Sequence, residues 1–93
     1  METNPVPKIK AFNRRILQVV SQMPDGYAYR TTIEGMIGEQ DALVDQFGGD
    51  LDVLEEQLGA EVEMHLRSLK RELKCARTLL EDEVCHFSQS DAN

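Results

Sequence analysis

The longest regular pattern of apolar positions lies between Glu61 and about Val84. Apolar residues recur there in steps of four and three, which places them on one face of an α-helix: Val62, Leu66, Leu69, Leu73, Ala76 and Leu80. No glycine or proline interrupts the run, and most of its residues favour helix. The pattern predicts a helix roughly 36 Å long. Its apolar face must be covered by the rest of the chain, by a partner, or by both.

A first helix is predicted from about Lys8 to Met23, where Pro24 ends it. Its apolar face contains Ile9, Phe12, Ile16, Val19, Val20 and Met23. The preceding residues include Pro5 and Pro7 and are expected to form an irregular tail.

A second helix should start between Tyr27 and Tyr29 and continue to about Phe47. A competing start is Thr31, which forms a capping-box pattern with Glu34. The expected apolar face holds Tyr29, Ile33, Met36, Leu43 and Phe47, with Ile37 alongside. Gly35 and Gly38 each weaken a helix, which implies either tertiary support or close approach by a neighbouring backbone.

A short helix from Leu51 to Leu58 is expected next, capped by Asp50 and bounded by glycines, with Leu51, Leu54 and Leu58 facing inward. No strand-like alternation is visible. The predicted fold is therefore all-α, an antiparallel three-helix bundle with a short additional helix between the second and last long helices. Residues 1–7 and 88–93 are expected to be a flexible N-terminal tail and a polar C-terminal tail around a helical domain at residues 8–87.

Composition narrows the possible functions. A chain of 93 residues with few aromatic side chains (5%) has little material for a rigid enzyme pocket. The net charge of −7 argues against nucleic acid as the main partner. Two cysteines, ten residues apart on the last predicted helix, cannot bridge and fit a reducing compartment. No apolar run reaches the length of a membrane span, and the basic first helix is compatible with an internal import signal.

Candidate chemistry is sparse. His65 is expected at the edge of the apolar face, as a surface or boundary residue. Glu83 and His86 have the spacing of a di-iron motif, but the second motif that such a site requires is missing, and Cys85 adds no ligand on another element. No nucleophile–base pattern or phosphate loop occurs. We therefore predict no catalytic, cofactor-binding or metal-binding residues and no enzymatic activity.

One charge pattern is more informative. Arg67, Lys70, Lys74 and Arg77 fall on one face of the last helix, with Arg71 beside them. Two interpretations carry equal weight: Glu55, Glu56 or the second helix neutralises this strip within the bundle, or the strip docks an acidic partner. Three acids follow, Glu81 to Glu83, and oppose the helix dipole if the helix ends there. Either the helix frays at that point, or these acids meet a basic surface on another subunit.

Three blocks of sequence resemble a known family. Met23-Pro24-Asp25-Gly26-Tyr27-Ala28-Tyr29-Arg30 resembles the P-x-x-x-A-Y-R junction of the alpha-subcomplex subunit 5 family, accessory subunits of mitochondrial respiratory complex I. Asp50 with Leu54-Glu55-x-Gln57-Leu58, and Glu72-Leu73-x-x-Ala76-Arg77, resemble two further blocks in the same order. Family members extend into a tail containing Trp and Pro, whereas this sequence has no Trp.

The resemblance implies a non-catalytic helical subunit without a redox centre, peripheral to the mitochondrial inner membrane on its matrix side. It would be part of a hetero-oligomer and bind core subunits of the quinone-proximal peripheral arm, chiefly the thirty-kilodalton core subunit, supporting assembly or stability of NADH:ubiquinone oxidoreductase. Our candidates for partner contacts are Tyr29, Arg30, Arg67, Lys70, Glu72, Lys74 and Arg77. The alternatives are a free-standing acidic helical adaptor in the cytosol and a metal-dependent helical-bundle enzyme.

Overall fold

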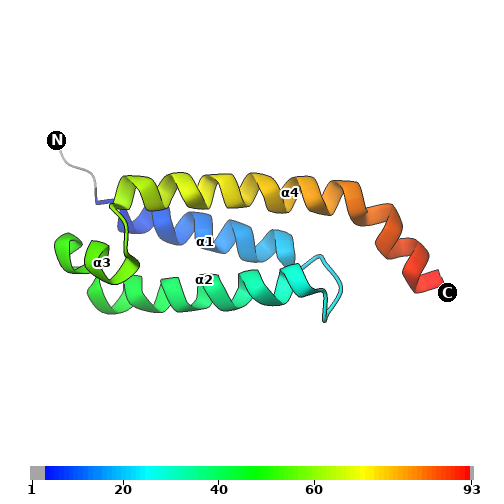
Figure 1. Ribbon diagram of the computed structural model, residues 1–93, viewed down its shortest axis with the longest axis horizontal. Coiled ribbons are helices and arrows are strands. Elements are labelled where there is room, and N and C mark those ends of the chain that lie inside the picture. The colour runs from blue at the N-terminus through cyan, green and yellow to red at the C-terminus, as the bar shows by residue number, and fades with distance from the viewer. Residues whose placement is uncertain (1–3, 93) are drawn as a thin grey trace.

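The computed structural model describes the backbone of residues 4–92 and the side chains of residues 4–82. Four helices follow one another: α1 (Val6–Val20), α2 (Ala28–Phe47), α3 (Leu51–Leu58) and α4 (Val62–Ala92). The described residues contain no strand. The predicted all-α bundle of three long helices with one short extra helix is therefore confirmed (Figure 1).

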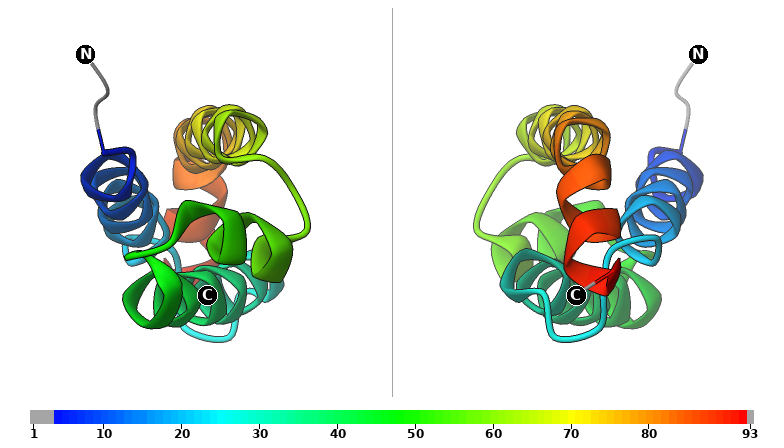
Figure 2. Two further views of the ribbon diagram at one scale, coloured as in Figure 1. Left: turned by 90° about the vertical axis from the view of Figure 1, so that its left-hand side faces the viewer. Right: turned by 90° about the vertical axis from the view of Figure 1, so that its right-hand side faces the viewer.

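Helix α1 packs along α4 on one side and along α2 on the other, whereas α3 covers one end of the bundle. Seen end-on, the three long helices occupy the corners of a triangle (Figure 2). Helices α1 and α4 run in the same direction and α2 runs opposite to both (Figure 1). A pair of neighbouring parallel helices thus forms one side of the molecule, and this pair carries the site described below.

The core is built from the apolar face of each helix. Ile9, Ile16 and Val20 of α1 are fully buried, and α2, α3 and α4 supply Ile33, Ile37, Val44, Leu54, Val62, Leu69, Leu73 and Ala76. Each buried Leu, Ile or Val side chain stabilises the fold by about 1.5–3 kcal/mol relative to exposure. The predicted stripe of α4 is confirmed as a core face, with Leu66 and Leu80 partly buried at its edges.

Two helix boundaries differ from the prediction. Helix α1 begins at Val6 because a proline is well tolerated in the first helical turn, and it ends at Val20 in a turn through Ser21. Helix α4 continues to Ala92, beyond the expected end near Val84, because no glycine or proline follows Gly59 to stop it. Glu81 and Asp82 consequently lie inside the helix, so the predicted clash with its C-terminal dipole does not arise.

The start of α2 at Ala28 is confirmed, and the competing start at Thr31 is wrong. The Thr31 N–H donates to the Tyr27 carbonyl oxygen at 3.1 Å, so Thr31 already lies within the first turn. The buried face of α2 is centred on Ile33, Ile37 and Val44, and Val44 was missing from the predicted face.

The short helix α3 has the predicted bounds and the predicted cap. One carboxylate oxygen of Asp50 accepts from the Asp52 N–H at 3.1 Å and from the Val53 N–H at 3.4 Å. Gly59 ends the helix with a φ of 78°, which glycine adopts without a steric penalty. The predicted inward orientation of Leu51 is wrong. Its side chain is 38% exposed, because only Leu54 and Leu58 of this short helix reach the core.

Candidate docking site

One surface feature is a groove between α1 and α4. A hollow of about 400 Å³ is lined by residues of both helices: Phe12, Arg15, Lys70, Leu73, Lys74, Arg77 and Thr78. A second hollow of about 330 Å³ lies further toward the start of α1 and is lined by Lys8, Ala11, Phe12 and Arg15. The hollow beside Lys8 is lined by α1 alone, but the two hollows share Phe12 and Arg15, and we call them together the basic groove.

The rims of the basic groove are cationic and its floor is apolar. Lys8 and Arg15 project from α1, and three cations project from α4, namely Lys70, Lys74 and Arg77. All five are exposed. Leu73 is 5% exposed and Phe12 is partly buried, so both lie beneath the charged rims. Among residues 4–82, no carboxylate lines either hollow.

Of the two interpretations of this strip, neutralisation within the bundle is not supported by any ion pair among the residues whose side chains are described. Within residues 4–82, every ion pair involves Lys10 or Arg30. Glu55, one of the expected neutralising acids, instead accepts from the Val62 N–H at 2.7 Å and satisfies a free donor at the start of α4. Arg67 also belongs to the predicted strip. It is exposed and forms no ion pair with a side chain of residues 4–82.

Charge is segregated between the helices. Every lysine and arginine except Arg30 lies on α1 or α4, and α1 carries no acid. Helices α2 and α3 carry seven acids: Glu34, Glu39, Asp41, Asp45, Asp52, Glu55 and Glu56. Helix α4 also carries six acids, but five of them lie outside residues 67–77, so the basic region consists of α1 and this stretch of α4.

Tyr29 and Glu72, two predicted partner contacts, bind each other. The Tyr29 hydroxyl donates to a carboxylate oxygen of Glu72 and so connects α2 to α4. Burial raises the pKa of Tyr29, and the hydrogen bond to Glu72 and its negative charge act in the same direction. Both side chains are partly buried. Their contact with a partner stays a prediction. Within the chain, their hydrogen bond holds α2 and α4 together.

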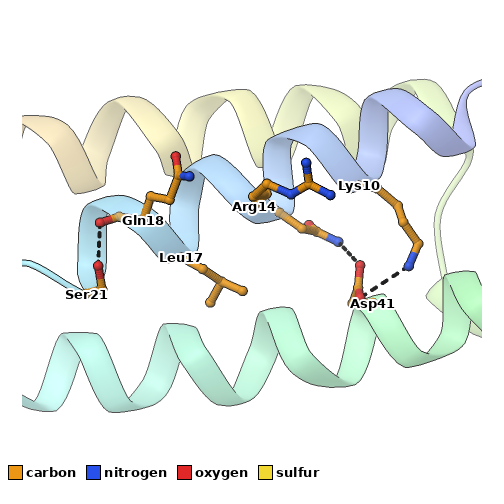
Figure 3. Close-up of a pocket in the computed structure, with 7 residues that line it drawn as sticks. Lys10, Arg14, Leu17, Gln18, Ser21 and Asp41 are labelled. Atoms are coloured by element: carbon orange, nitrogen blue, oxygen red, sulfur yellow. Dashed lines mark hydrogen bonds and ion pairs between the residues drawn. The ribbon is translucent and has the colours of Figure 1, made fainter.

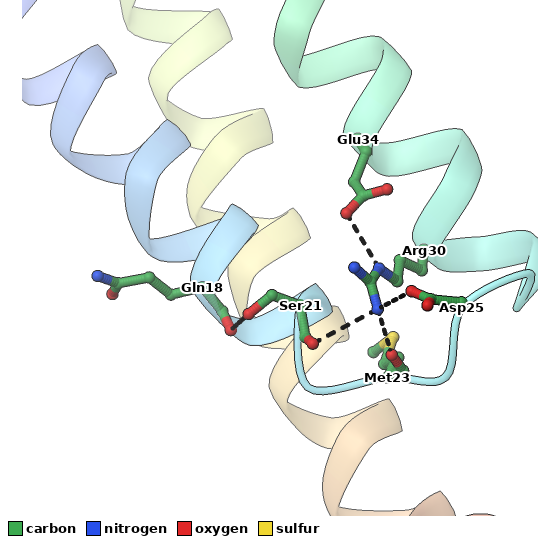
Figure 4. A network of polar contacts seen from close by, with 6 residues as sticks. All are labelled: Gln18, Ser21, Met23, Asp25, Arg30 and Glu34. Atoms are coloured by element: carbon green, nitrogen blue, oxygen red, sulfur yellow. Dashed lines mark hydrogen bonds and ion pairs between the residues drawn. The ribbon is translucent and has the colours of Figure 1, made fainter.

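Arg30 organises the connection between α1 and α2 (Figure 4). Its Nη1 donates to the Met23 carbonyl oxygen at 2.6 Å and to the Ser21 carbonyl oxygen at 3.5 Å. The same nitrogen lies 2.9 Å from an Asp25 carboxylate oxygen, and Nε lies 3.0 Å from Glu34. The guanidinium thus binds free carbonyls just beyond the end of α1, which is a favourable position for a cation.

A third hollow, of about 430 Å³, lies between α1 and α2 (Figure 3). Lys10 pairs there with Asp41 at 3.4 Å and with Asp45. These acids raise the pKa of Lys10, and Asp45 has the largest effect. Asn13 donates to Asp41 at 3.1 Å and is only 2% exposed. The cations on this side of α1 are therefore partly neutralised by α2.

His65 is buried, with 6% of its surface exposed, so its predicted position at the surface or boundary is wrong. It lies three residues after Val62 and four before Leu69, which places it on the core face of α4. Burial lowers its pKa. The same spacing rule identifies Asn13, which lies four residues after Ile9 and three before Ile16; sequence reasoning missed it because it is polar.

Other candidate chemistry finds no site in the described part of the chain. Among the described residues, no group of three or more His, Cys, Asp or Glu side chains is placed to hold a metal ion. Glu83, Cys85 and His86 lie outside the described side chains. Cys75 is a free, exposed cysteine. Across the described helices, none combines the length and apolarity required to cross a membrane.

Comparison with known proteins identifies a family match. A family model described as the ETC complex I subunit conserved region matches residues 1–64. The matched span includes α1, α2, α3 and the start of α4. It therefore contains the Arg30 network and the α1 rim of the basic groove. No curated protein and no solved structure matches the chain.

Proposed function

The chain belongs to this family of respiratory complex I subunits, the alpha-subcomplex subunit 5 family, and we propose that it is a non-catalytic accessory subunit of the peripheral arm. Family membership associates the chain with a multi-subunit electron-transport complex of the mitochondrial inner membrane. The finer proposal is a position on the matrix side, on core subunits of the quinone-proximal module, chiefly the thirty-kilodalton core subunit. There the chain supports assembly or stability of NADH:ubiquinone oxidoreductase.

The unpaired cations of α4 carry the proposal that the chain acts by docking. Arg67, Lys70, Lys74 and Arg77 are exposed, and within residues 4–82 no carboxylate pairs with them. Like charges at helical spacings of three and four residues repel each other by about 0.2–0.5 kcal/mol per pair. An acidic surface on a core subunit removes this repulsion and gains attraction, so the strip suits a subunit that functions in a complex.

The other predicted contacts serve this docking surface indirectly in our proposal. Polar atoms of Tyr29, Arg30 and Glu72 are already bonded within the chain. Their bonds fix α2 and the connecting loop against α1 and α4, and so keep the basic region of the molecule in one shape. We further propose that residues 8–87 act together as one docking domain.

The test is native-gel analysis of mitochondria that express a tagged copy. After solubilisation in a mild detergent, we expect the tag to migrate with the band that has NADH dehydrogenase activity. Migration of the tagged chain alone, while complex I remains intact in cells that lack the chain, would contradict the proposal. The variant Arg30→Ala tests the indirect role of the Arg30 network. It should weaken co-migration of the chain with complex I only to the extent that it lowers the melting temperature of the chain.

A further inference from the structure

We propose that the basic groove binds an acidic amphipathic helix of a partner protein, with the apolar side of that helix on Phe12 and Leu73 and its carboxylates on the two cationic rims. This inference rests on the proposed function and specifies the kind of partner surface that the chain recognises. It also extends the docking surface to α1, through Lys8 and Arg15, neither of which belongs to the strip on α4.

The first argument is the exclusion of acids from the groove. The chain has 17 acidic residues and pairs Lys10 and Arg30 with four of them, Asp25, Glu34, Asp41 and Asp45. Among the side chains of residues 4–82, no acid lines the groove, and Glu72, the only acid on α4 between Glu63 and Glu81, is bonded to Tyr29. Five exposed cations therefore surround an apolar floor without an ion pair to any of these described carboxylates. The occupant that compensates them must carry negative charge.

The second argument is the spacing of the cations along the rims. Lys8 and Arg15 are seven residues apart on α1, and Lys70 and Arg77 are seven apart on α4, with Lys74 between them. At 1.5 Å per residue, each rim spans roughly 10 Å. Residues seven apart on a partner helix span the same distance and lie on one face. Two rows of carboxylates, one on each flank of an apolar seam, therefore match both rims at once.

The third argument is the shape of the surface. The hollow lined by both helices lies between α1 and α4 and has Phe12 and Leu73 beneath its rims, and the hollow beside Lys8 shares Phe12 and Arg15 with it. A helix laid between two helices contacts both and buries its apolar face, as in other helix-in-groove complexes. A flat anionic membrane reaches the rims but leaves the apolar floor uncovered, so the partner helix is the better fit.

The probe for a test is a designed, fluorescently labelled peptide of about 18 residues, with an apolar seam at heptad positions and Glu on both flanks. Its control has Gln in place of every flanking Glu. In fluorescence-anisotropy titrations against the full chain, we expect saturable binding of the Glu peptide that weakens as salt is raised, and at least tenfold weaker binding of the Gln peptide. Equal binding of both peptides, or none of the Glu peptide, would overturn the inference.

Charge-reversed chains locate the binding site. Lys70→Glu/Lys74→Glu removes two groove cations, whereas Arg14→Glu/Arg71→Glu makes the same change in net charge at exposed positions that do not line the groove. We expect the first variant to lose at least tenfold in affinity for the Glu peptide and the second to change little. Lys70→Gln/Lys74→Gln gives an intermediate loss without adding acids, and circular-dichroism melting curves check that all three variants fold. An equal loss in the groove variant and its control would refute the groove as the site.

Two other occupants are tested directly. Vesicles containing about one-third anionic lipid should not retain the chain in flotation assays at physiological salt. Sedimentation should show a monomer at the concentrations used for binding. Flotation that depends on Lys70 and Lys74, or a dimer abolished by their reversal, would each overturn the assignment of the groove to a partner helix.

The native gel separates this inference from the proposed function. If the wild-type chain migrates with complex I and the Lys70→Glu/Lys74→Glu variant does so equally well, the groove inference fails and complex membership stands. If the wild-type chain never migrates with complex I although it binds the Glu peptide through the groove, the proposed function fails and the groove inference stands.

Discussion

Two glycines of α2 destabilise the isolated chain, and their replacement by alanine should raise its melting temperature. Gly35 and Gly38 lie in the helix interior and are exposed. A Cβ atom built at either position meets no heavy atom within 4 Å, so the close approach suggested by the sequence does not occur within the described chain. Each Gly→Ala change should stabilise the helix by about 0.5–1 kcal/mol, because glycine loses more backbone entropy on folding.

The expected size of the effect follows from these values. The two sites together should give about 1–2 kcal/mol, which for a domain of this size corresponds to an increase of roughly 4–16 °C in melting temperature. Thermal unfolding of Gly35→Ala/Gly38→Ala, followed by circular dichroism, measures it. A melting temperature equal to or below that of the wild type would refute the reasoning.

The chain supplies its own control glycines. Gly59 has a φ of 78°, so alanine there is strained whatever the space around it. At Gly48 an added Cβ would lie 2.5 Å from the Val44 carbonyl oxygen and 3.3 Å from a methyl carbon of Val6. Gly48→Ala and Gly59→Ala should therefore lower the melting temperature, although each makes the same chemical change as the stabilising pair.

Further predictions concern the polar contacts of the bundle. Tyr29→Phe should destabilise the chain by about 1 kcal/mol, since a partly exposed hydrogen bond to the Glu72 carboxylate is lost, and a double-mutant cycle with Glu72→Gln should show coupling of similar size. Because the pKa of Tyr29 is raised in the folded chain, the stability that Tyr29 contributes is complete below pH 10 and is lost as pH rises beyond that value. Tyr29→Phe should abolish this pH dependence. The pKa of His65 is lowered by burial, so its effect on stability has the opposite sign. The stability that neutral His65 allows is complete above the ordinary pKa of 6.5 and falls as pH decreases below it. Urea unfolding between pH 7 and 5 should therefore show a decrease in the free energy of unfolding that His65→Leu reduces. Arg30→Ala should cost about 1–2 kcal/mol in urea unfolding through loss of the bonds to Met23 and Glu34, and Arg30→Lys should recover only part of it. Asp50→Ala should cost about 1 kcal/mol by removing the N-cap of α3, whereas Asp50→Ser should restore most of the stability in the same assay.

Local pattern was sufficient to locate the four helices and most of the apolar residues on their core faces. The four-three spacing in α4 and the stop signals at Pro24, Gly48 and Gly59 are properties of short segments, and each gave the correct element. The boundary errors also have local causes. A proline just before or within the first turn does not delay a helix, and a polar ending without glycine or proline does not stop one.

The basic groove depends on tertiary structure and was only half predicted. The cations of α4 share a face in the sequence pattern, but Lys8, Phe12 and Arg15 join them only because α1 lies beside α4 in the same direction. Asn13 and His65 were missed for a different reason. Periodicity was assessed on apolar residues alone, whereas a helix buries every side chain on its inner face, including polar ones.

The bases of α1 and of residues 67–77 of α4 are not matched by equally many bases on α2 and α3, so charge is unevenly distributed over the molecule. The chain measures 52 × 23 × 17 Å, whereas the Debye length at physiological salt is about 8 Å. An acidic surface that approaches α1 and α4 therefore experiences mainly the nearby cations, and the distant acids are screened. Attraction between these cations and the acidic surface favours encounters in which the basic region approaches first. A protein with a net charge of −7 can thus be steered toward an acidic partner, and lowering the ionic strength should speed the correctly oriented encounter while also strengthening the repulsion of wrongly oriented ones.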